Sequence, residues 1–194
     1  MTKKLFKILV DLDGVICNLD ATLLKTYRLK FPSLPYIPLQ DRVGQCSDLQ
    51  YLEKFGPKEA SAVQKILKTP GFYRTIEPNP DAIKGIKELN KRRDLKLYIC
   101  TSPWHRNPTC VQDKIDWIGE HLGKSWVKKT IITPDKSLIK GDVLLDDRCD
   151  IDKLGKVDFQ HVMVRCEHNE GVKNRFVLEN LRDKNEIIDA VLYK

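Results

Sequence analysis

The amino-acid sequence predicts an α/β protein with one mostly parallel, five-stranded sheet, helices on both faces, and a small helical cap inserted after the first strand. Three observations indicate this fold. Short apolar runs alternate with amphipathic helical patterns, several of the runs end in aspartate or in threonine and serine, and the interval between Asp11 and Asp81 has helical patterns but no convincing strand. Strands that alternate with helices are typical of a parallel sheet covered by helices.

Five segments are typical of strands that could be buried on both faces. They are LFKILVD (5–11), LKLYIC (95–100), VKKTIIT (127–133), DVLLDD (142–147) and FQHVMVRC (159–166). Helical patterns separate several of them, so we expect a Rossmann-like sheet.

Three helical segments lie between or after these strands. In PDAIKGIKELNKRR the apolar side chains share one face, Asn79 is placed to cap the helix, and Pro80 suits its first position. The C-terminal NEIIDAVLYK predicts a last short helix. In VQDKIDWIGEHLG the expected buried stripe, which ends before Gly123, consists of Val111, Ile115, Ile118 and Leu122.

The cap is expected over residues 17–76, with a catalytic core formed by residues 1–16 and 77–194. Within the cap the sequence predicts a helix at 18–30, a proline-rich loop, and a second helix near GPKEASAVQKILK. We expect this insertion to set substrate specificity.

The composition is that of a globular protein, with 41% hydrophobic and 31% charged residues. No apolar run approaches the ~20 residues of a membrane span, and the first run meets Asp11 and Asp13 where a signal peptide would be cleaved. We therefore expect a cytoplasmic protein without a membrane partner. The net charge is +7, but the lysines are scattered, which favours a small phosphorylated substrate over nucleic acid. The six cysteines have no CxxC or zinc-like spacing, so most are expected to be small buried hydrophobes.

Polar residues stand at the carboxyl ends of four predicted strands, where open parallel sheets bind ligands. The carboxylates are Asp11, Asp13, Asp146 and Asp147, and the phosphate-binding candidates are Thr101, Ser102 and Lys136 together with the backbone near Gly14. Crowded carboxylates repel one another, and Mg²⁺ resolves this repulsion while sharing its coordination with a phosphate. Each motif alone is more often a turn, a cap or a solvated side chain. Their order along four strands of one rim is what predicts a site.

This ordered set resembles the four motifs of the haloacid dehalogenase superfamily, through ILVDLDGV, LYICTS, Lys136 and LLDD. The resemblance extends to a narrower group, the pyrimidine-type 5′(3′)-deoxyribonucleotidases, through IPLQDRVG, ICTSP, TPDK, LLDDRCDI and the late His168-Asn169 pair. It implies a Mg²⁺-dependent phosphomonoesterase that acts on nucleoside monophosphates.

The resemblance also implies a role for each matching residue. Asp11 would be the nucleophile that forms an aspartyl-phosphate, and Asp13 the general acid and base. Mg²⁺ would be held by the side chains of Asp11 and Asp146 and by the main-chain carbonyl of Asp13, with Asp147 in support. Thr101, Ser102 and Lys136 would bind the phosphate and balance the charge that develops on it.

The cap departs from the nucleotidase pattern. The segment Gly44-Gln45-Cys46-Ser47 has no aromatic residue to stack on a base, Leu19 replaces an aromatic, and Pro134 stands where the family can have a basic residue. The residues left as substrate contacts are Trp104, Tyr73 and Phe72, for which packing between cap and core is the competing interpretation.

Three other functions stay open at this point. The first is a phosphatase of the same superfamily for another small phosphorylated metabolite, which the missing aromatics favour. The second is a non-enzymatic binding protein on a retired catalytic fold, against which the intact motifs argue. The third is a nucleic-acid end-processing phosphatase, which the positive charge alone supports. A homodimer is likewise left open.

Overall fold

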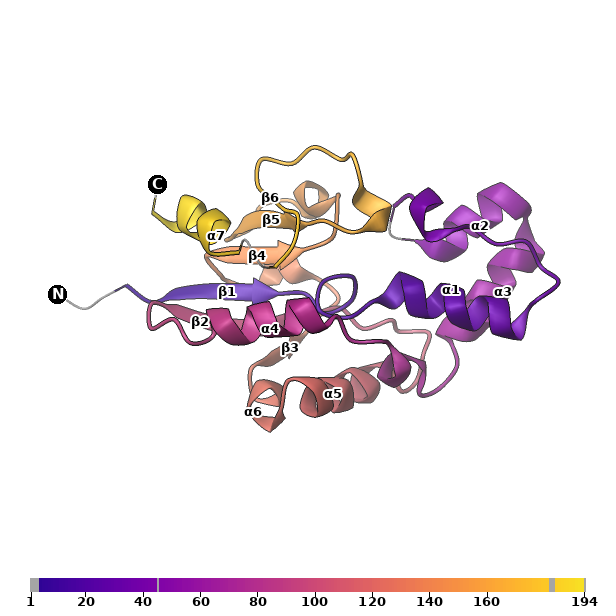
Figure 1. Cartoon of the computed structure of the whole chain (residues 1–194), viewed down its shortest axis with the longest axis horizontal. Coiled ribbons are helices and arrows are strands. Elements are labelled where there is room, and N and C mark those ends of the chain that lie inside the picture. Colours follow the sequence, from indigo (N-terminus) through magenta and orange to yellow (C-terminus); the bar gives the residue numbers. More distant parts are fainter. Residues whose placement is uncertain (1–3, 45, 182–183, 194) are drawn as a thin grey trace.

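The computed structural model describes residues 4–44, 46–181 and 184–193 and has an α/β fold built on one six-stranded sheet (Figure 1). The strands lie in the order β3-β2-β1-β4-β5-β6, and every neighbouring pair is parallel. Their bounds are β1 (Phe6–Val10), β2 (Leu95–Thr101), β3 (Thr130–Ile132), β4 (Val143–Asp146), β5 (Gln160–Val164) and β6 (Val177–Leu178). All carboxyl ends therefore meet at one edge of the sheet.

The sheet has one strand more than the sequence predicted. The sixth strand, β6, has two residues and pairs with the end of β5, with Val177 opposite Met163 and Leu178 opposite Val164. Two residues are too few to give an alternating or continuous apolar pattern. The third predicted strand, 127–133, also begins too early, because Lys124–Val127 forms the short helix α6 and β3 starts at Thr130.

The two faces of the sheet are covered differently. Ile8 and Val10 of β1 point into the larger apolar cluster, to which helices α4 (Pro80–Leu89), α5 (Cys110–His121) and α7 (Lys184–Leu192) contribute. Leu9, between them in sequence, points to the opposite face, as period-2 alternation requires. There a smaller cluster is closed by loops and by the 3₁₀ helix η4 (Ile151–Leu154). The central strand β1 is thus anchored by side chains on both faces.

Helix α4 begins as predicted, because the Asn79 side chain accepts a hydrogen bond from the Ala82 N–H and Pro80 holds the first position. Helix α5 forms at the predicted place, and Ile118 and Leu122 of the expected stripe are buried. The start of the stripe was wrong, because Val111 is 50% exposed, whereas Lys114 and Trp117 are buried. Among the described residues, no helix is both long and apolar enough to cross a membrane.

Between β1 and α4 the chain forms a group of helices beyond the carboxyl ends of the strands (Figure 1). These are α1 (Leu19–Lys30), η1 (Leu39–Asp41), α2 (Ser47–Phe55), α3 (Pro57–Leu67) and η2 (Phe72–Thr75). Helices α1 and α3 were predicted, and α2 was missed. Gly56, with φ +109°, ends α2, and Pro57 begins α3 directly after it. The cap boundaries at 17 and 76 remain a prediction.

The two ends of the described chain lie together at the opposite end of the molecule from α1–α3 (Figure 1). The Tyr193 ring packs edge-on against Phe6 of β1, with 5.4 Å between ring centroids. The Tyr193 hydroxyl donates a hydrogen bond to Asp94 Oδ2 at 2.7 Å. The last predicted helix ends at Leu192, and Lys194 lies outside the described residues.

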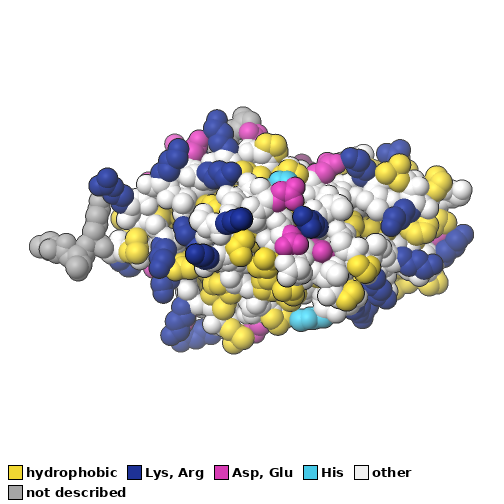
Figure 2. All heavy atoms as spheres, turned by 90° about the horizontal axis from the view of Figure 1, so that it is seen from below, with side chains coloured by type: hydrophobic (Ala, Val, Ile, Leu, Met, Phe, Trp, Pro, Cys, Tyr) yellow, Lys and Arg dark blue, Asp and Glu magenta, His cyan; other side chains and the backbone are white. Residues whose placement is uncertain are grey.

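Charged side chains are spread over the surface. On the face shown in Figure 2, lysine and arginine side chains extend along the whole length of the molecule, and acidic side chains gather near its middle. This distribution agrees with the scattered lysines of the sequence.

Candidate active site

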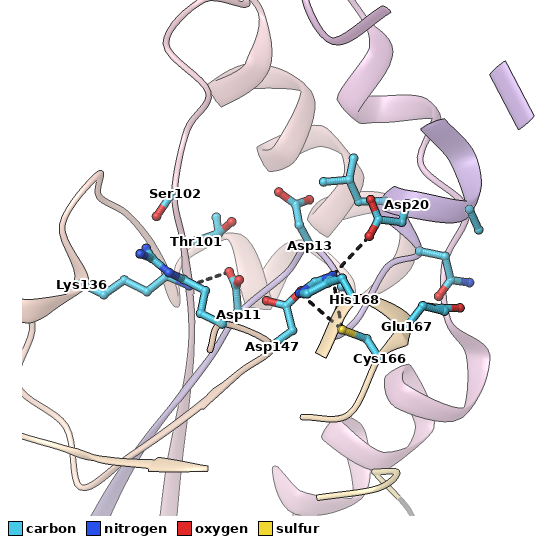
Figure 3. Close-up of a pocket in the computed structure, with 15 residues that line it drawn as sticks. Asp11, Asp13, Asp20, Thr101, Ser102, Lys136, Asp147, Cys166, Glu167 and His168 are labelled. Atoms are coloured by element: carbon cyan, nitrogen blue, oxygen red, sulfur yellow. Dashed lines mark hydrogen bonds and ion pairs between the residues drawn. The ribbon is translucent and has the colours of Figure 1, made fainter. Parts of the chain in front are cut away.

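The strand ends form the floor of a cavity of about 210 Å³ (Figure 3). The predicted residues that line it are Asp11, Asp13, Gly14, Thr101, Ser102, Lys136 and Asp147. Asp146 lies directly beneath and is fully buried. The residues that sequence reasoning did not assign to the site are Asn18, Leu19, Asp20, Ala21, Arg148, Cys166, Glu167 and His168. The structure therefore brings the four motifs together at one rim.

Lys136 joins two of the carboxylates. Its Nζ lies 2.9 Å from Asp11 Oδ1 and 2.5 Å from Asp146 Oδ2, and the residue is 2% exposed. Burial acts to lower the pKa of Lys136, but the charges of Asp11 and Asp146 outweigh it, so the pKa is raised and the amine stays protonated. A fixed positive charge beside Asp11 is what a transferred phosphoryl group requires.

Asp146 and Asp147 carry a strong electrostatic penalty. Burial is the main reason that the pKa of each is raised, and in Asp147 the neighbouring charge of Asp146 raises it further. Asp11, Asp146 and Asp147 each offer one carboxylate oxygen, and these oxygens lie within 4.8 Å of one another. Three converging oxygen donors, of which Asp146 and Asp147 have raised pKa values, fit a hard divalent cation such as Mg²⁺.

Gly14 allows this arrangement. It has φ +73°, and a Cβ at this position would lie 1.9 Å from Asp147 Oδ2. Glycine is therefore required both for the backbone conformation and for the space that the carboxylate occupies. The Gly14 N–H donates to the Cys17 carbonyl at 2.9 Å, so its expected use as a phosphate donor would require that this bond opens.

Two hydroxyls, those of Thr101 and Ser102, line the cavity at the carboxyl end of β2. Thr101 is fully buried, and the Ser102 hydroxyl oxygen is buried without a hydrogen-bond partner in the described part of the chain. An unpaired buried hydroxyl costs about 1–3 kcal/mol. A phosphate oxygen in the cavity would satisfy the Ser102 hydroxyl, which fits its predicted role.

Lys114 is a site residue that the sequence pattern did not reveal. It lies on α5, is 1% exposed, and its Nζ is 2.6 Å from Asp13 Oδ2. Burial acts to lower the pKa of Lys114, but the negative charges of Asp13 and Asp11 act to raise it. Their effect is the larger one, so the pKa of Lys114 is raised. The signal lay in Cys110, Lys114 and Trp117, which share one helical face, but a search for apolar residues alone selects Val111 and Ile115 instead.

His168 lies across the cavity from Lys136, in the 3₁₀ helix η5 (Glu167–Asn169) (Figure 3). Its Nδ1 lies 3.2 Å from Asp20 Oδ2 on α1, and its Nε2 lies 3.5 Å from Asp147 Oδ2. Burial acts to lower the pKa of His168, but the hydrogen bond to Asp20 and neighbouring groups raise it to about 10. The imidazolium thus links a carboxylate on α1 to one that follows β4.

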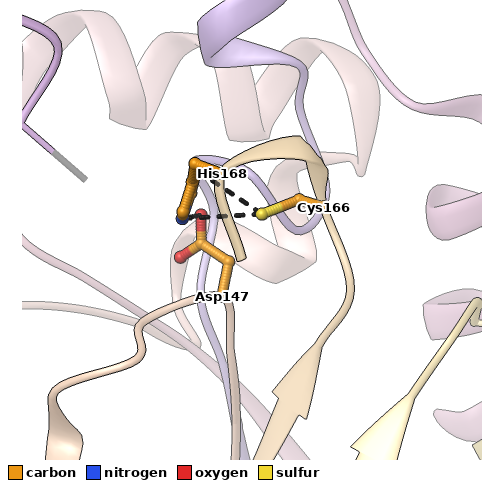
Figure 4. Close-up of side chains that lie close together, drawn as sticks. All are labelled: Asp147, Cys166 and His168. Atoms are coloured by element: carbon orange, nitrogen blue, oxygen red, sulfur yellow. Dashed lines mark hydrogen bonds and ion pairs between the residues drawn. The ribbon is translucent and has the colours of Figure 1, made fainter. Parts of the chain in front are cut away.

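Cys166 completes a second cluster with His168 and Asp147 (Figure 4). Its Sγ lies 3.4 Å from Nδ1 and 3.5 Å from Nε2 of His168. Nearly equal distances to both ring nitrogens place the sulfur over the ring, away from the direction of either nitrogen lone pair. The spatial cluster was not visible in the sequence spacing of cysteines and histidines.

The aromatic residues proposed as substrate contacts are not among those lining the cavity. Phe72 and Tyr73 are 5% and 4% exposed and pack edge-on against each other, with 5.4 Å between centroids. Trp104 is partly buried and packs against the larger apolar cluster. A contact between these rings and a substrate remains a prediction.

Comparisons with known proteins agree with this geometry. Residues 4–193 match the family model described as 5′ nucleotidase, deoxy (Pyrimidine), cytosolic type C protein. The chain is 35% identical over 164 residues to the cytosolic-type 5′(3′)-deoxyribonucleotidase of Homo sapiens, covering 84% of this chain and 81% of that protein. It is 30% identical over 169 residues to the mitochondrial 5′(3′)-deoxyribonucleotidase of Mus musculus, covering 87% and 76%.

A solved structure supports the fold. The HAD hydrolase YfnB from Bacillus subtilis, determined with bound magnesium, superposes with a TM-score of 0.60 and covers 96% of this chain and 100% of its own. The two sequences are 12% identical, so this likeness concerns the fold alone.

Proposed function

We infer the function of this chain from its family, since it belongs to the 5′ nucleotidase, deoxy (Pyrimidine), cytosolic type C proteins. We propose that it hydrolyses the phosphate ester of deoxyribonucleoside monophosphates. The names of its relatives support this substrate class. The observation that carries the proposal is the convergence of Asp11, Thr101, Lys136 and Asp146 from four separate segments around one cavity. The label of the human relative as cytosolic supports a cytoplasmic location.

The reaction begins with attack by Asp11 on the phosphorus atom. The bond from phosphorus to the leaving oxygen breaks, and Asp13 gives its proton to that oxygen. Asp13 then takes a proton from water, the water oxygen attacks the aspartyl-phosphate, and inorganic phosphate leaves. Lys136, Thr101 and Ser102 hold the phosphoryl oxygens, where positioning and charge do most of the catalysis.

Mg²⁺ is the proposed cofactor. The side chains of Asp11 and Asp146 and the carbonyl of Asp13 would hold it, with Asp147 in support. When bound, the ion would supply positive charge to the phosphoryl oxygens and offset repulsion among the carboxylates. The elevated pKa values of Asp146 and Asp147 support a cation at this place.

A panel of phosphate esters with Mg²⁺ tests the proposal, with phosphate release as the measurement. We expect turnover of dUMP and dTMP above that of sugar phosphates. The Asp11→Asn variant should lose at least about 1000-fold in kcat, the order seen when a nucleophile is removed. Equal turnover of sugar phosphates and nucleotides would count against the nucleotidase assignment, and an active Asp11→Asn variant against the mechanism.

A second candidate is a phosphatase for another small phosphorylated metabolite. It is favoured by one observation, that the described residues lining the cavity include no phenylalanine, tyrosine or tryptophan to stack on a base. The same panel of phosphate esters distinguishes the two candidate functions, because the second candidate predicts a non-nucleotide ester as the best substrate.

A further inference from the structure

Lys114 is buried beside the proposed acid, and each of its three N–H bonds has an acceptor in the site. Nζ donates to Asp13 Oδ2 at 2.6 Å, to Thr101 Oγ1 at 2.8 Å and to the Ser102 carbonyl at 2.7 Å. The side chain is 1% exposed and does not line the cavity, so it acts on substrate only through its partners.

The chemistry of the ammonium group fixes the direction of these bonds. A protonated lysine has three donors and no acceptor. Thr101 Oγ1 must therefore accept from Lys114, which leaves the Thr101 hydrogen free to point to another acceptor. Since Thr101 lines the cavity, a phosphoryl oxygen bound there is the acceptor within its reach.

The hydrogen-bond donors around Asp13 distinguish its two carboxylate oxygens. Oδ2 accepts the short bond from Lys114, and Oδ1 lies 3.6 Å from the Cys17 sulfur, a weak donor. A proton on Oδ2 would face the ammonium group, so the proton that reaches the leaving oxygen is carried on Oδ1.

We propose that Lys114 is a positioning residue that orients Asp13 for proton transfer through Oδ1 and fixes the Thr101-Ser102 segment beside the phosphate. The inference rests on the proposed function, since it assigns Asp13 the role of acid. No residue of the four motifs performs this task in the structure, because Lys136 faces Asp11 and Asp146 instead.

The nature of the leaving group provides a test. Departure of a nucleoside alkoxide from dUMP needs a proton, whereas p-nitrophenolate leaves without one. We expect Lys114→Met to lower kcat/KM for dUMP by about 100-fold or more, the range of general acid catalysis, and for p-nitrophenyl phosphate by less than about 10-fold. The constant kcat/KM reports the steps up to departure of the leaving group, so the later use of Asp13 as base does not enter.

Lys84→Met is the control, because Lys84 is exposed on α4 and its loss should change neither constant. If Lys114→Met does not fold by circular dichroism, Lys114→Arg replaces it. Arginine keeps the charge, but its planar fork does not match three acceptors around one nitrogen, so the same unequal loss is expected. Equal losses for both substrates in the folded variant, or no loss for dUMP, would overturn the proposal.

Failure of the proposed function is distinguishable from failure of this inference. If the wild-type protein hydrolyses p-nitrophenyl phosphate and an alkyl phosphate such as glycerol phosphate but no nucleotide, the substrate assignment is wrong. The unequal loss is then measured with the alkyl phosphate, and its presence or absence still decides the role of Lys114.

Discussion

At the scale of single residues, negative charge accumulates on the cavity floor. Asp11 and Asp146 face the ammonium of Lys136, Asp147 lies beside these two carboxylates, and burial raises the pKa of Asp147 well above its ordinary value. A carboxyl group whose pKa is raised in the folded state destabilises the protein at pH values above its unfolded pKa, because folding then disfavours the charged carboxylate. Asp147 should therefore lower the unfolding free energy of the metal-free protein at neutral pH.

The Asp147→Asn variant tests this balance. In chelator at pH 7 we expect its Tm to equal or exceed that of the wild type, because the penalty of an ionised buried carboxylate is removed. Saturating Mg²⁺ should raise the wild-type Tm by about 5–10 °C and that of the variant by much less, since a ligand at 100 times its Kd adds about 2.7 kcal/mol. A lower Tm in chelator would contradict the electrostatic account.

The residues of the four motifs could be predicted because each stands directly after a strand, and parallel strands end together. Asp20, Arg148 and Cys166 could not, since they come from a helix start and from loops whose path is set by tertiary packing. Lys114 was missed for a narrower reason, that a long polar side chain on a buried helical face does not register in a search for apolar periodicity.

At the scale of elements, the turn after β1 depends on Gly14. A side chain there would collide with Asp147 Oδ2, at 1.9 Å, and would also strain the backbone at φ +73°. The turn and the loop after β4 are thus fitted to each other.

Gly14→Ala should lose about 1–2 kcal/mol of unfolding free energy from the backbone alone, with a further loss and at least a 10-fold fall in kcat as Asp147 is displaced. Gly171→Ala is the matched control, because Gly171 has φ +76° and a methyl group added there would meet nothing within 4 Å. Urea denaturation and phosphate release measure the two effects. Equal losses of unfolding free energy and of kcat in the two variants would show that backbone strain causes the effect, and not displacement of the Asp147 carboxylate.

The element η5 joins the cap through His168. Besides its pair with Asp20, the His168 carbonyl accepts a hydrogen bond from the Gly44 N–H at 3.1 Å. Burial acts to raise the pKa of Asp20, but His168 and Arg42 outweigh it and the pKa is lowered. Both partners are therefore charged near neutral pH.

The stability of this link should depend on pH. The folded pKa of His168 is raised from 6.5 to about 10, so its contribution is complete below pH 6.5 and is lost as the pH rises toward 10. We expect the unfolding free energy of the wild type to fall by about 5 kcal/mol over this interval, since each unit of the pKa difference is worth about 1.4 kcal/mol. His168→Gln should remove this slope, and His105→Gln, an exposed histidine, should keep it. An unchanged slope in His168→Gln would refute the assignment.

The long elements were predictable and the short ones were not. Strands such as Leu95–Thr101 are long enough to carry an apolar run, here residues 97–100, whereas β6 has two residues and pairs with β5. Helix α2 was missed because only Ser47 and Tyr51 of its nine residues are buried, which leaves no apolar stripe to recognise.

At the scale of the whole molecule, helix α1 and the sheet each supply one wall of the cavity. Leu19, Asp20 and Ala21 line it from α1, and the strand ends line it from the sheet. In the proposed function, the side chains at the start of α1 would contact the part of the substrate that is not phosphate.

Leu19→Phe should improve binding of pyrimidine nucleotides. Stacking of a base on an aromatic ring is worth about 1–3 kcal/mol, so KM for dUMP should fall by about 5-fold or more with kcat little changed. Leu24→Phe is the control, because Leu24 lies on α1 but does not line the cavity. Steady-state kinetics measure both, and an unchanged or higher KM for Leu19→Phe would show that the base does not approach this wall.

The contact between Tyr193 and Phe6 has a consequence for engineering. It keeps the two ends of the described chain side by side, away from the helices that cover the cavity. A short peptide could join them, and new ends could be opened in a surface loop, because circular permutation tolerates such joins. Labels or solid supports attached near the contact between Tyr193 and Phe6 would leave the opening of the active-site cavity free.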